Sequence, residues 1–165
     1  MKITAELIKS HAPWKKHKDI NLRLVKSVLA QTLKHFPKYK DTQEIEIAIL
    51  LTDNSYMQSL NLEFRDKNKP TNVLSFPGIA IAPKDILEFI PPKDYMYLGD
   101  IAFGYEAICS EASEGEKAFQ DHFTHLLIHG ILHLLGLDHM QESDAKVMQD
   151  LEVEILKSFK IVSPY

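Results

Sequence analysis

Three histidines of this 165-residue chain have the spacing of metal ligands. If the segment that carries them is helical, His129 and His133 lie four residues apart on one face, so two imidazoles can reach one metal ion. Gly136 follows one turn later, where glycine commonly ends a helix, and a reversal of the chain there would bring in His139. Three nitrogen ligands and an open fourth position are typical of a catalytic zinc site. We therefore predict that His129, His133 and His139 bind one Zn²⁺ ion.

Three other polar residues of the same segment are open to more than one interpretation. His125 lies one turn before His129, and it is a fourth ligand, a partner that orients a ligand, or a core residue; we favour the second or third role. Asp138 either accepts the second N–H of a ligand imidazole or caps the following turn. His122 is expected at the surface.

Gly130 bears on the type of reaction. The histidine spacing is close to the zinc-peptidase motif H-E-x-x-H-x-x-G-x-x-H, but Gly130 stands where peptidases carry a glutamate general base. Zinc peptidases generally use that carboxylate to accept the proton of the attacking water. Cleavage of a phosphodiester depends less on such a base, because zinc lowers the pKa of bound water toward about 7. It mainly requires positive charge near the phosphoryl oxygens, where negative charge develops. The sequence thus disfavours a peptidase.

Arginine is scarce, with only Arg23 and Arg65 in the chain. Arg65 is followed closely by Lys67 and Lys69, which add positive potential. A guanidinium can hold a phosphate through two hydrogen bonds, which a lysine cannot do. Arg65 is therefore a candidate phosphate-binding residue, although the segment taken alone is also typical of a solvated loop.

Hydrophobic periodicity and turn residues predict the elements that must position these side chains. The proline-rich segment 79–95 is expected to be a loop. The predicted order is an N-terminal strand, a helix capped by Asp19 and ended by Pro37, a strand over 44–51, a helix capped within 53–55, strands over 71–76 and 98–103, and helices over 105–113, 118–135 and 143–159. This order predicts one α+β domain over 1–165, with a small mixed β-sheet covered by helices and the zinc-binding helix in the C-terminal half.

Composition limits the class of protein. A chain with 45% hydrophobic and 25% charged residues is expected to be globular. The single cysteine, Cys109, excludes an internal disulfide, and we find neither a signal peptide nor an apolar run long enough to cross a membrane, so the cytoplasm is the expected compartment. The net charge of −4 is unevenly distributed, because basic residues outnumber acidic ones over 1–84 and the reverse holds over 85–165. A basic face on an acidic protein is therefore possible.

Several segments resemble one known family. The run from His129 to His139, HGILHLLGLDH, is similar to the signature H-G-x-L-H-L-x-G-x-D-H of the YbeY family of rRNA-maturation endoribonucleases. The resemblance extends from about Ile45 to Ile155. Other matching segments are Phe64–Arg65, Pro70–Phe76 (PTNVLSF), Leu98–Ile101 (LGDI) and His125. This chain departs from the family in having Leu137 where an aromatic residue is common, and a longer segment over 79–95.

The resemblance implies a small α+β zinc protein with Arg65 as the active-site arginine. It also implies single-strand-specific RNA cleavage, maturation of small-subunit rRNA, a role in ribosome quality control, and contact with the small ribosomal subunit or its proteins. Because no proton acceptor is evident, a ribosome-assembly factor with a purely structural zinc ion remains open. A fourth protein ligand such as His125 would favour that alternative, and a metallopeptidase ranks third because of Gly130.

Overall fold

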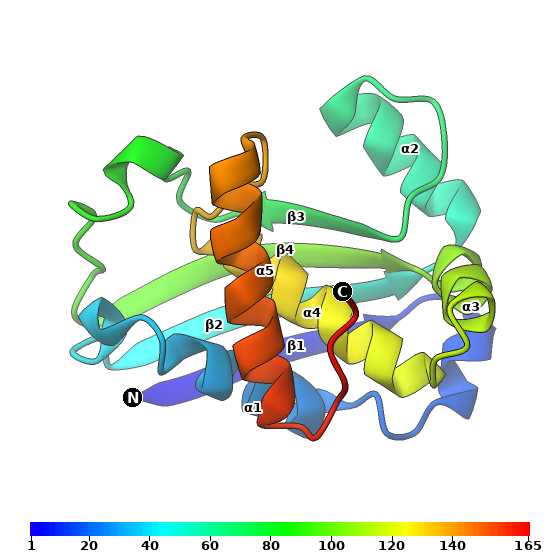
Figure 1. The fold of residues 1–165 in the computed structure, drawn as a ribbon, viewed down its shortest axis with the longest axis horizontal. Helices are drawn as coiled ribbons and strands as arrows, with labels where there is room; N and C mark the ends of the chain where they lie inside the picture. The colour runs from blue at the N-terminus through cyan, green and yellow to red at the C-terminus, as the bar shows by residue number, and fades with distance from the viewer.

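The fold is built on a four-stranded mixed β-sheet, on which the helices pack (Figure 1). The computed structural model describes residues 1–165, except for the side chain of Pro83. Strands β1, β2 and β4 run parallel, β3 pairs antiparallel with β4, and the order across the sheet is β1-β2-β4-β3. The strands are β1 (Lys2–Lys9), β2 (Glu44–Thr52), β3 (Val73–Pro77) and β4 (Tyr95–Gly104).

Five α-helices follow the predicted order and confirm the α+β class. In Figure 1, helices α1, α4 and α5 lie on one side of the sheet, whereas α2 lies beyond β3. The helices are α1 (Leu22–Leu33), α2 (Asn54–Arg65), α3 (Tyr105–Glu114), α4 (Phe119–Leu134) and α5 (Glu142–Lys157), and short 3₁₀ turns span Ala12–Lys16, Pro37–Tyr39 and Pro83–Asp85. No helix within the described residues is long and apolar enough to cross a lipid bilayer.

Strand β2 shows why the sheet has one heavily covered face. Alternate side chains of a strand point to opposite faces, and Ile45, Ile47 and Ile49 are fully or almost fully buried on one of them. These residues belong to the main core, which also contains the apolar side chains of α1 and α4. Met57 of α2 packs on the other face, against a much smaller cluster.

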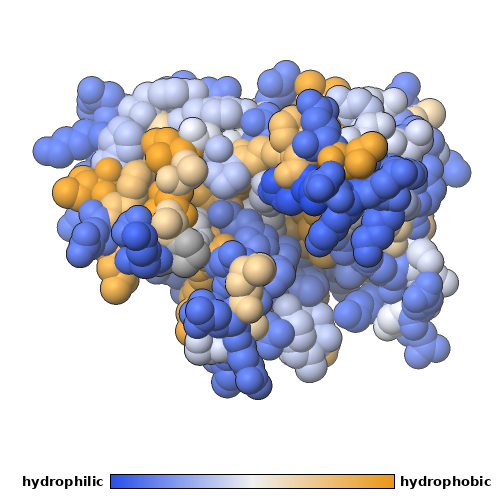
Figure 2. All heavy atoms as spheres, turned by 90° about the horizontal axis from the view of Figure 1, so that it is seen from above, coloured by the Kyte–Doolittle hydropathy of each residue, from blue (hydrophilic) through white to orange (hydrophobic). Residues whose placement is uncertain are grey.

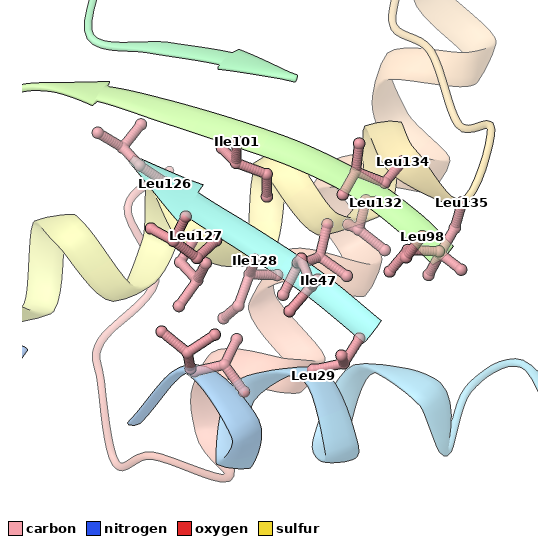
Figure 3. Close-up of a cluster of buried hydrophobic side chains, with 14 of the residues drawn as sticks. Leu29, Ile47, Leu98, Ile101, Leu126, Leu127, Ile128, Leu132, Leu134 and Leu135 are labelled. Carbon is pink, nitrogen blue, oxygen red and sulfur yellow. The ribbon is translucent and has the colours of Figure 1, made fainter. Parts of the chain in front are cut away.

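Helix α4 is the centre of the main core. Figure 3 shows Leu127, Ile128 and Leu132 of α4 between the sheet and α1, where they face Ile47 and Leu29. A helix that is apolar on most sides must be enclosed by other elements, and α4 is enclosed by the sheet, α1, α3 and α5. Two of the predicted zinc ligands, His129 and His133, therefore lie on a helix held from several sides.

The backbone of α4 touches the sheet at Gly130. A Cβ atom at this position would lie 2.9 Å from Cδ1 and 3.0 Å from Cγ2 of Ile101 in β4. The hydroxyl of Ser75 in β3 donates a hydrogen bond of 3.1 Å to the carbonyl oxygen of Gly130. Any larger side chain at position 130 would push the helix away from β3 and β4.

The structure corrects the predicted start of α1. Asn21 is the N-cap, and its side-chain oxygen accepts hydrogen bonds from the backbone N–H groups of Arg23 (3.0 Å) and Leu24 (3.1 Å). Asp19 is not the cap because Ile20, which follows it, is fully buried in the core, and the helix begins only after that anchor. Elsewhere the prediction is confirmed, since Asp53 caps α2 by accepting from the N–H of Tyr56 at 2.8 Å.

Other predicted boundaries shift by a few residues. Strand β4 begins at Tyr95, three residues before the predicted strand, so the expected loop over 79–95 ends earlier and contains a 3₁₀ turn. Strand β3 begins two residues late, at Val73. The extra residues at the start of β4 are paired with the first residues of β2, Glu44 with Tyr95 and Glu46 with Tyr97, before β3 joins the other edge of β4 at Gly99.

Gly130→Ala should cost about 1–3 kcal/mol in packing against Ile101, which cancels or outweighs the gain of about 1 kcal/mol that alanine brings to a helix interior. Urea denaturation measures the effect. Gln149→Ala, at an exposed position of α5, is the control and should leave the free energy of unfolding nearly unchanged. A variant more stable than wild type by about 1 kcal/mol, the full helix-propensity gain, would contradict the close approach of α4.

Candidate metal centre

The C-terminal end of α4 brings the predicted ligands together. Gly136 has a φ of 97°, in the left-handed region that glycine adopts at little cost. The N–H of Leu137 donates to the carbonyl of Leu132 at 3.0 Å, and the N–H of Gly136 donates to that of His133 at 3.0 Å. This Schellman-type turn ends the helix as predicted and directs the chain back so that His139 faces the helix.

His129, His133 and His139 form one cluster, as the sequence predicted. Each offers a ring nitrogen, and these atoms all lie within 4.8 Å of one another. The Nε2 atoms of His129 and His133 are 3.1 Å apart, and the ring centroids of His133 and His139 are 5.0 Å apart. His129 and His133 are half-buried, whereas His139 is exposed at the mouth of the site.

The tautomers of two rings indicate a cation site. His133 Nδ1 lies 2.9 Å from the carbonyl oxygen of Leu137, which can only accept, so Nδ1 carries the proton. His129 Nδ1 is likewise 2.7 Å from a carboxylate oxygen of Glu152. When both rings are neutral, their Nε2 atoms present lone pairs to each other at 3.1 Å, an unfavourable contact that a shared cation removes. Three neutral imidazole nitrogens fit Zn²⁺, although the same donor set also suits nickel and copper.

The electrostatics of the metal-free site keep His133 neutral. Burial, helped by the neighbouring rings of His129 and His139, lowers the pKa of His133 to about 4. The carbonyl of Leu137 and the carboxylate of Asp138 oppose this effect only in part. A metal ligand must present an unprotonated nitrogen, so a low pKa makes His133 available for binding near neutral pH.

Glu152 of α5 is a site residue that the sequence analysis did not predict. Its carboxylate, 1% exposed, accepts hydrogen bonds from His129 Nδ1 (2.7 Å), His125 Nε2 (3.0 Å) and the hydroxyl of Tyr165. Burial alone would raise the pKa of Glu152, but these three donors lower it to about 2. The signal in the sequence was an acidic residue on the apolar face of α5, between the buried Met148 and Ile155.

The structure also places the residues of uncertain role. His125 contacts Glu152 and stands apart from the ligand cluster, so it is a partner behind the site. Asp138 caps a turn, because its Oδ1 accepts from the backbone N–H of His139 at 2.7 Å. The expected surface position of His122 is wrong. It is buried, with Nε2 at 2.6 Å from Glu111, because α3 covers that side of α4.

The histidines open into a cleft of about 670 Å³. Its walls include the three histidines and three basic side chains, those of Arg65, Lys67 and Lys69. Figure 2 looks onto the edge of the molecule that carries α2 and the 79–90 segment, and the surface is hollowed between hydrophobic atoms on the left and hydrophilic atoms on the right. The combination of imidazoles and cations suits an anionic ligand.

Arg65 lies at the end of α2 on the wall of this cleft. Its Nη2 donates to the carbonyl of Ser75 at 3.0 Å, and Cζ lies 5.6 Å from the ring centroid of Phe76. Ser75 also donates through its hydroxyl to Gly130, the neighbour of His129. One residue of β3 therefore links the arginine to the helix that carries the histidines, while the exposed guanidinium keeps further N–H groups for a ligand.

The absence of a peptidase glutamate has a steric cause in this fold. A Cβ atom at Gly130 would point at Ile101 and at Ser75 Oγ, which is 3.2 Å away. A glutamate at position 130 would thus be directed into the sheet. The site lacks the general base that a peptidase of this motif uses.

Comparisons with known proteins identify the family of this chain. A family model described as "Endoribonuclease YbeY" matches residues 12–160. The chain belongs to the YbeY family. A relative from Chelativorans sp. (strain BNC1), named Endoribonuclease YbeY, is 48% identical over 122 residues, which cover 74% of this chain and 71% of the relative. The YbeY signature predicted at 129–139 therefore identified the family correctly.

A solved structure supports the fold. The solution structure of TM1509 from Thermotoga maritima, described as VT1, a NESGC target protein, matches with a TM-score of 0.53 over 95% of this chain and 92% of that one. The two sequences are 20% identical, so this likeness concerns the fold alone.

The metal-free protein should lose stability as the pH falls from about 6.5 to about 4. The unfolded chain binds a proton at His133 near the ordinary pKa of 6.5, whereas the folded ring stays neutral until about pH 4. Denaturation in the presence of a chelator should show a loss of about 1–2 kcal/mol, after allowance for solvent screening. His133→Gln removes the titrating ring and should flatten the curve over this range. Parallel curves for the two proteins would contradict the prediction.

Proposed function

We propose that this protein is a zinc-dependent, single-strand-specific endoribonuclease that matures small-subunit ribosomal RNA. The proposal rests on one observation: the three imidazoles and Arg65 line the same cleft. Ser75 of β3 links them, because it accepts a hydrogen bond from Arg65 and donates one to Gly130 of α4. Membership of the endoribonuclease family supports RNA as the substrate. The proposed zinc dependence is supported by the ligand set of His129, His133 and His139.

Each residue of the cleft has a role in this proposal. When bound by the three histidines, zinc supplies Lewis-acid chemistry at the scissile phosphate. Arg65 donates N–H groups to phosphoryl oxygens and stabilises the charge that develops on them in the transition state. Ser75 and Phe76 hold the guanidinium in place, so that little reorganisation is needed when the substrate arrives.

Lys67 and Lys69 extend the positive wall of the cleft away from Arg65. Point charges of this kind attract the RNA backbone without reading its sequence, and their contribution weakens as salt rises. The protein has a net charge of −4, so this local surface differs in sign from the whole. Binding should therefore concentrate at the cleft.

The proposal includes a cellular setting. We propose that the protein acts in the cytoplasm, where it contacts the small ribosomal subunit or its proteins and contributes to ribosome quality control. These partners follow from the resemblance of residues 129–139 to the signature of rRNA-maturation endoribonucleases.

A second proposal, a ribosome-assembly factor with a structural zinc ion, is less well supported. A closed structural site needs four protein ligands, and His125 was the candidate for the fourth. His125 instead directs Nε2 to Glu152, and the cluster within the described residues has three members. This arrangement favours the enzyme.

Arg65→Ala should lower the rate of RNA cleavage by about 100-fold or more while the zinc content stays unchanged, because one donor to the transition state is lost. Cleavage of a labelled single-stranded RNA and metal analysis measure the two quantities. Arg23→Ala, the only other arginine position, is the matched control because Arg23 does not line the cleft. Loss of zinc in Arg65→Ala would assign the arginine a structural role instead.

His133→Ala should abolish both zinc binding and RNA cleavage, because two histidines hold zinc far more weakly than three. His35→Ala, an exposed histidine outside the cluster, should retain both. A chelator should inactivate wild type, and added zinc should restore it. Cleavage by metal-free wild type would contradict the proposed metal dependence, and zinc binding without cleavage, even with ribosomal particles present, would favour the assembly factor.

A further inference from the structure

The segment after α5 returns to the back of the metal centre. Lys160 has a φ of 58°, and the N–H of Ile161 donates to the carbonyl of Leu156 at 3.2 Å, so the chain reverses at the end of the helix. Figure 1 shows this segment, in red, running back beside α4 and α5. The backbone N–H of Tyr165 then donates to the hydroxyl of Ser163 at 3.2 Å. This path brings the Tyr165 side chain to the buried carboxylate of Glu152.

The two oxygens of Glu152 have different partners. Oε2 accepts from Tyr165 and from His125 Nε2, whereas Oε1 accepts from His129 Nδ1. The terminal torsion of a glutamate is broad, so the side chain alone does not fix which oxygen faces which donor. Two donors on Oε2 fix the plane of the carboxylate, and this leaves Oε1 directed at His129.

We propose that Glu152 and Tyr165 are positioning residues for the metal centre: Glu152 holds His129 in the tautomer that presents Nε2, and Tyr165 holds Glu152. The inference rests on the proposed metal centre and adds residues outside the ligand set. A carboxylate behind a ligand histidine fixes the orientation of the ring and increases its basicity. Tyr165 lies beyond residues 12–160, which the family model matches.

Hydrophobic packing does not explain why a glutamate stands at position 152. Glu152 is as buried as the neighbouring Ile155 and Met148, yet it carries a charge, which is costly in such a place unless donors surround it. An apolar side chain would fill the same space at lower cost. The three donors converge from α4 and from the segment after α5, and one of them is a predicted zinc ligand.

The test compares Glu152→Gln, Tyr165→Phe and wild type by two measurements. Long-range ¹H–¹⁵N correlation spectra of the metal-free proteins report the tautomer of His129. Competition with a chromophoric chelator reports the zinc dissociation constant. Glu154→Gln, exposed on the same helix, and Tyr56→Phe, an exposed tyrosine of α2, are the matched controls.

Wild type should show His129 with its proton on Nδ1. Glu152→Gln should lose this single tautomer and raise the zinc dissociation constant by about 10–100-fold. Tyr165→Phe should raise it by about 3–10-fold, since one of three donors to the carboxylate is lost. Both controls should match wild type, and thermal unfolding of the metal-free variants shows whether a change merely reflects damage to the fold.

An unchanged His129 tautomer in Glu152→Gln, or unchanged zinc affinity in both variants, overturns the inference. Tyr165→Phe keeps the test decisive if Glu152→Gln fails to fold, because it removes one hydroxyl at the edge of the structure. Failure of wild type to bind zinc would instead overturn the proposed metal centre. The two failures are therefore distinguishable.

Discussion

The contact between the backbone of α4 and the β-sheet at Gly130 is the constraint on which the site depends. Because no side chain separates them, Ile101 packs directly on the helix and Ser75 donates to its carbonyl. Ser75 also accepts from Arg65 through its own carbonyl, so the distance between helix and strand sets the distance between arginine and histidines. A glutamate at position 130 would separate helix and sheet. The same glycine therefore builds the cleft and excludes the peptidase arrangement.

Placing polar side chains on an enclosed helix has a cost that neighbouring helices offset. The imidazole nitrogens of α4 that face away from the cleft need hydrogen-bonding partners, since an unpartnered buried polar group is destabilising by about 1–3 kcal/mol. Helix α3 supplies Glu111 to His122, and α5 supplies Glu152 to both His125 and His129. Most acidic residues of the C-terminal half are exposed. The carboxylates of Glu111 and Glu152 instead accept hydrogen bonds from histidines of α4.

The charge of the cleft follows from the positions of its side chains in the sequence. The basic side chains of Arg65, Lys67 and Lys69 come from the end of α2 and the segment after it, in the basic half of the chain. The histidines come from the acidic half, and folding brings the two halves together at the cleft. A protein with a net charge of −4 thereby gains a local surface suited to a polyanion.

The sequence alone predicted the elements and the candidate ligands, because both depend on local spacing. The interval between His129 and His133 is one helical turn, and Gly136 marks the reversal that brings in His139. Tertiary structure alone decided the rest. The start of α1 depended on the burial of Ile20, and the burial of His122 depended on where α3 packs. The partnership of Glu152 with His129 joins residues 23 positions apart on different helices. Sequence periodicity shows which face of a helix is apolar, but the neighbour that covers each polar side chain is decided only when the helices pack together.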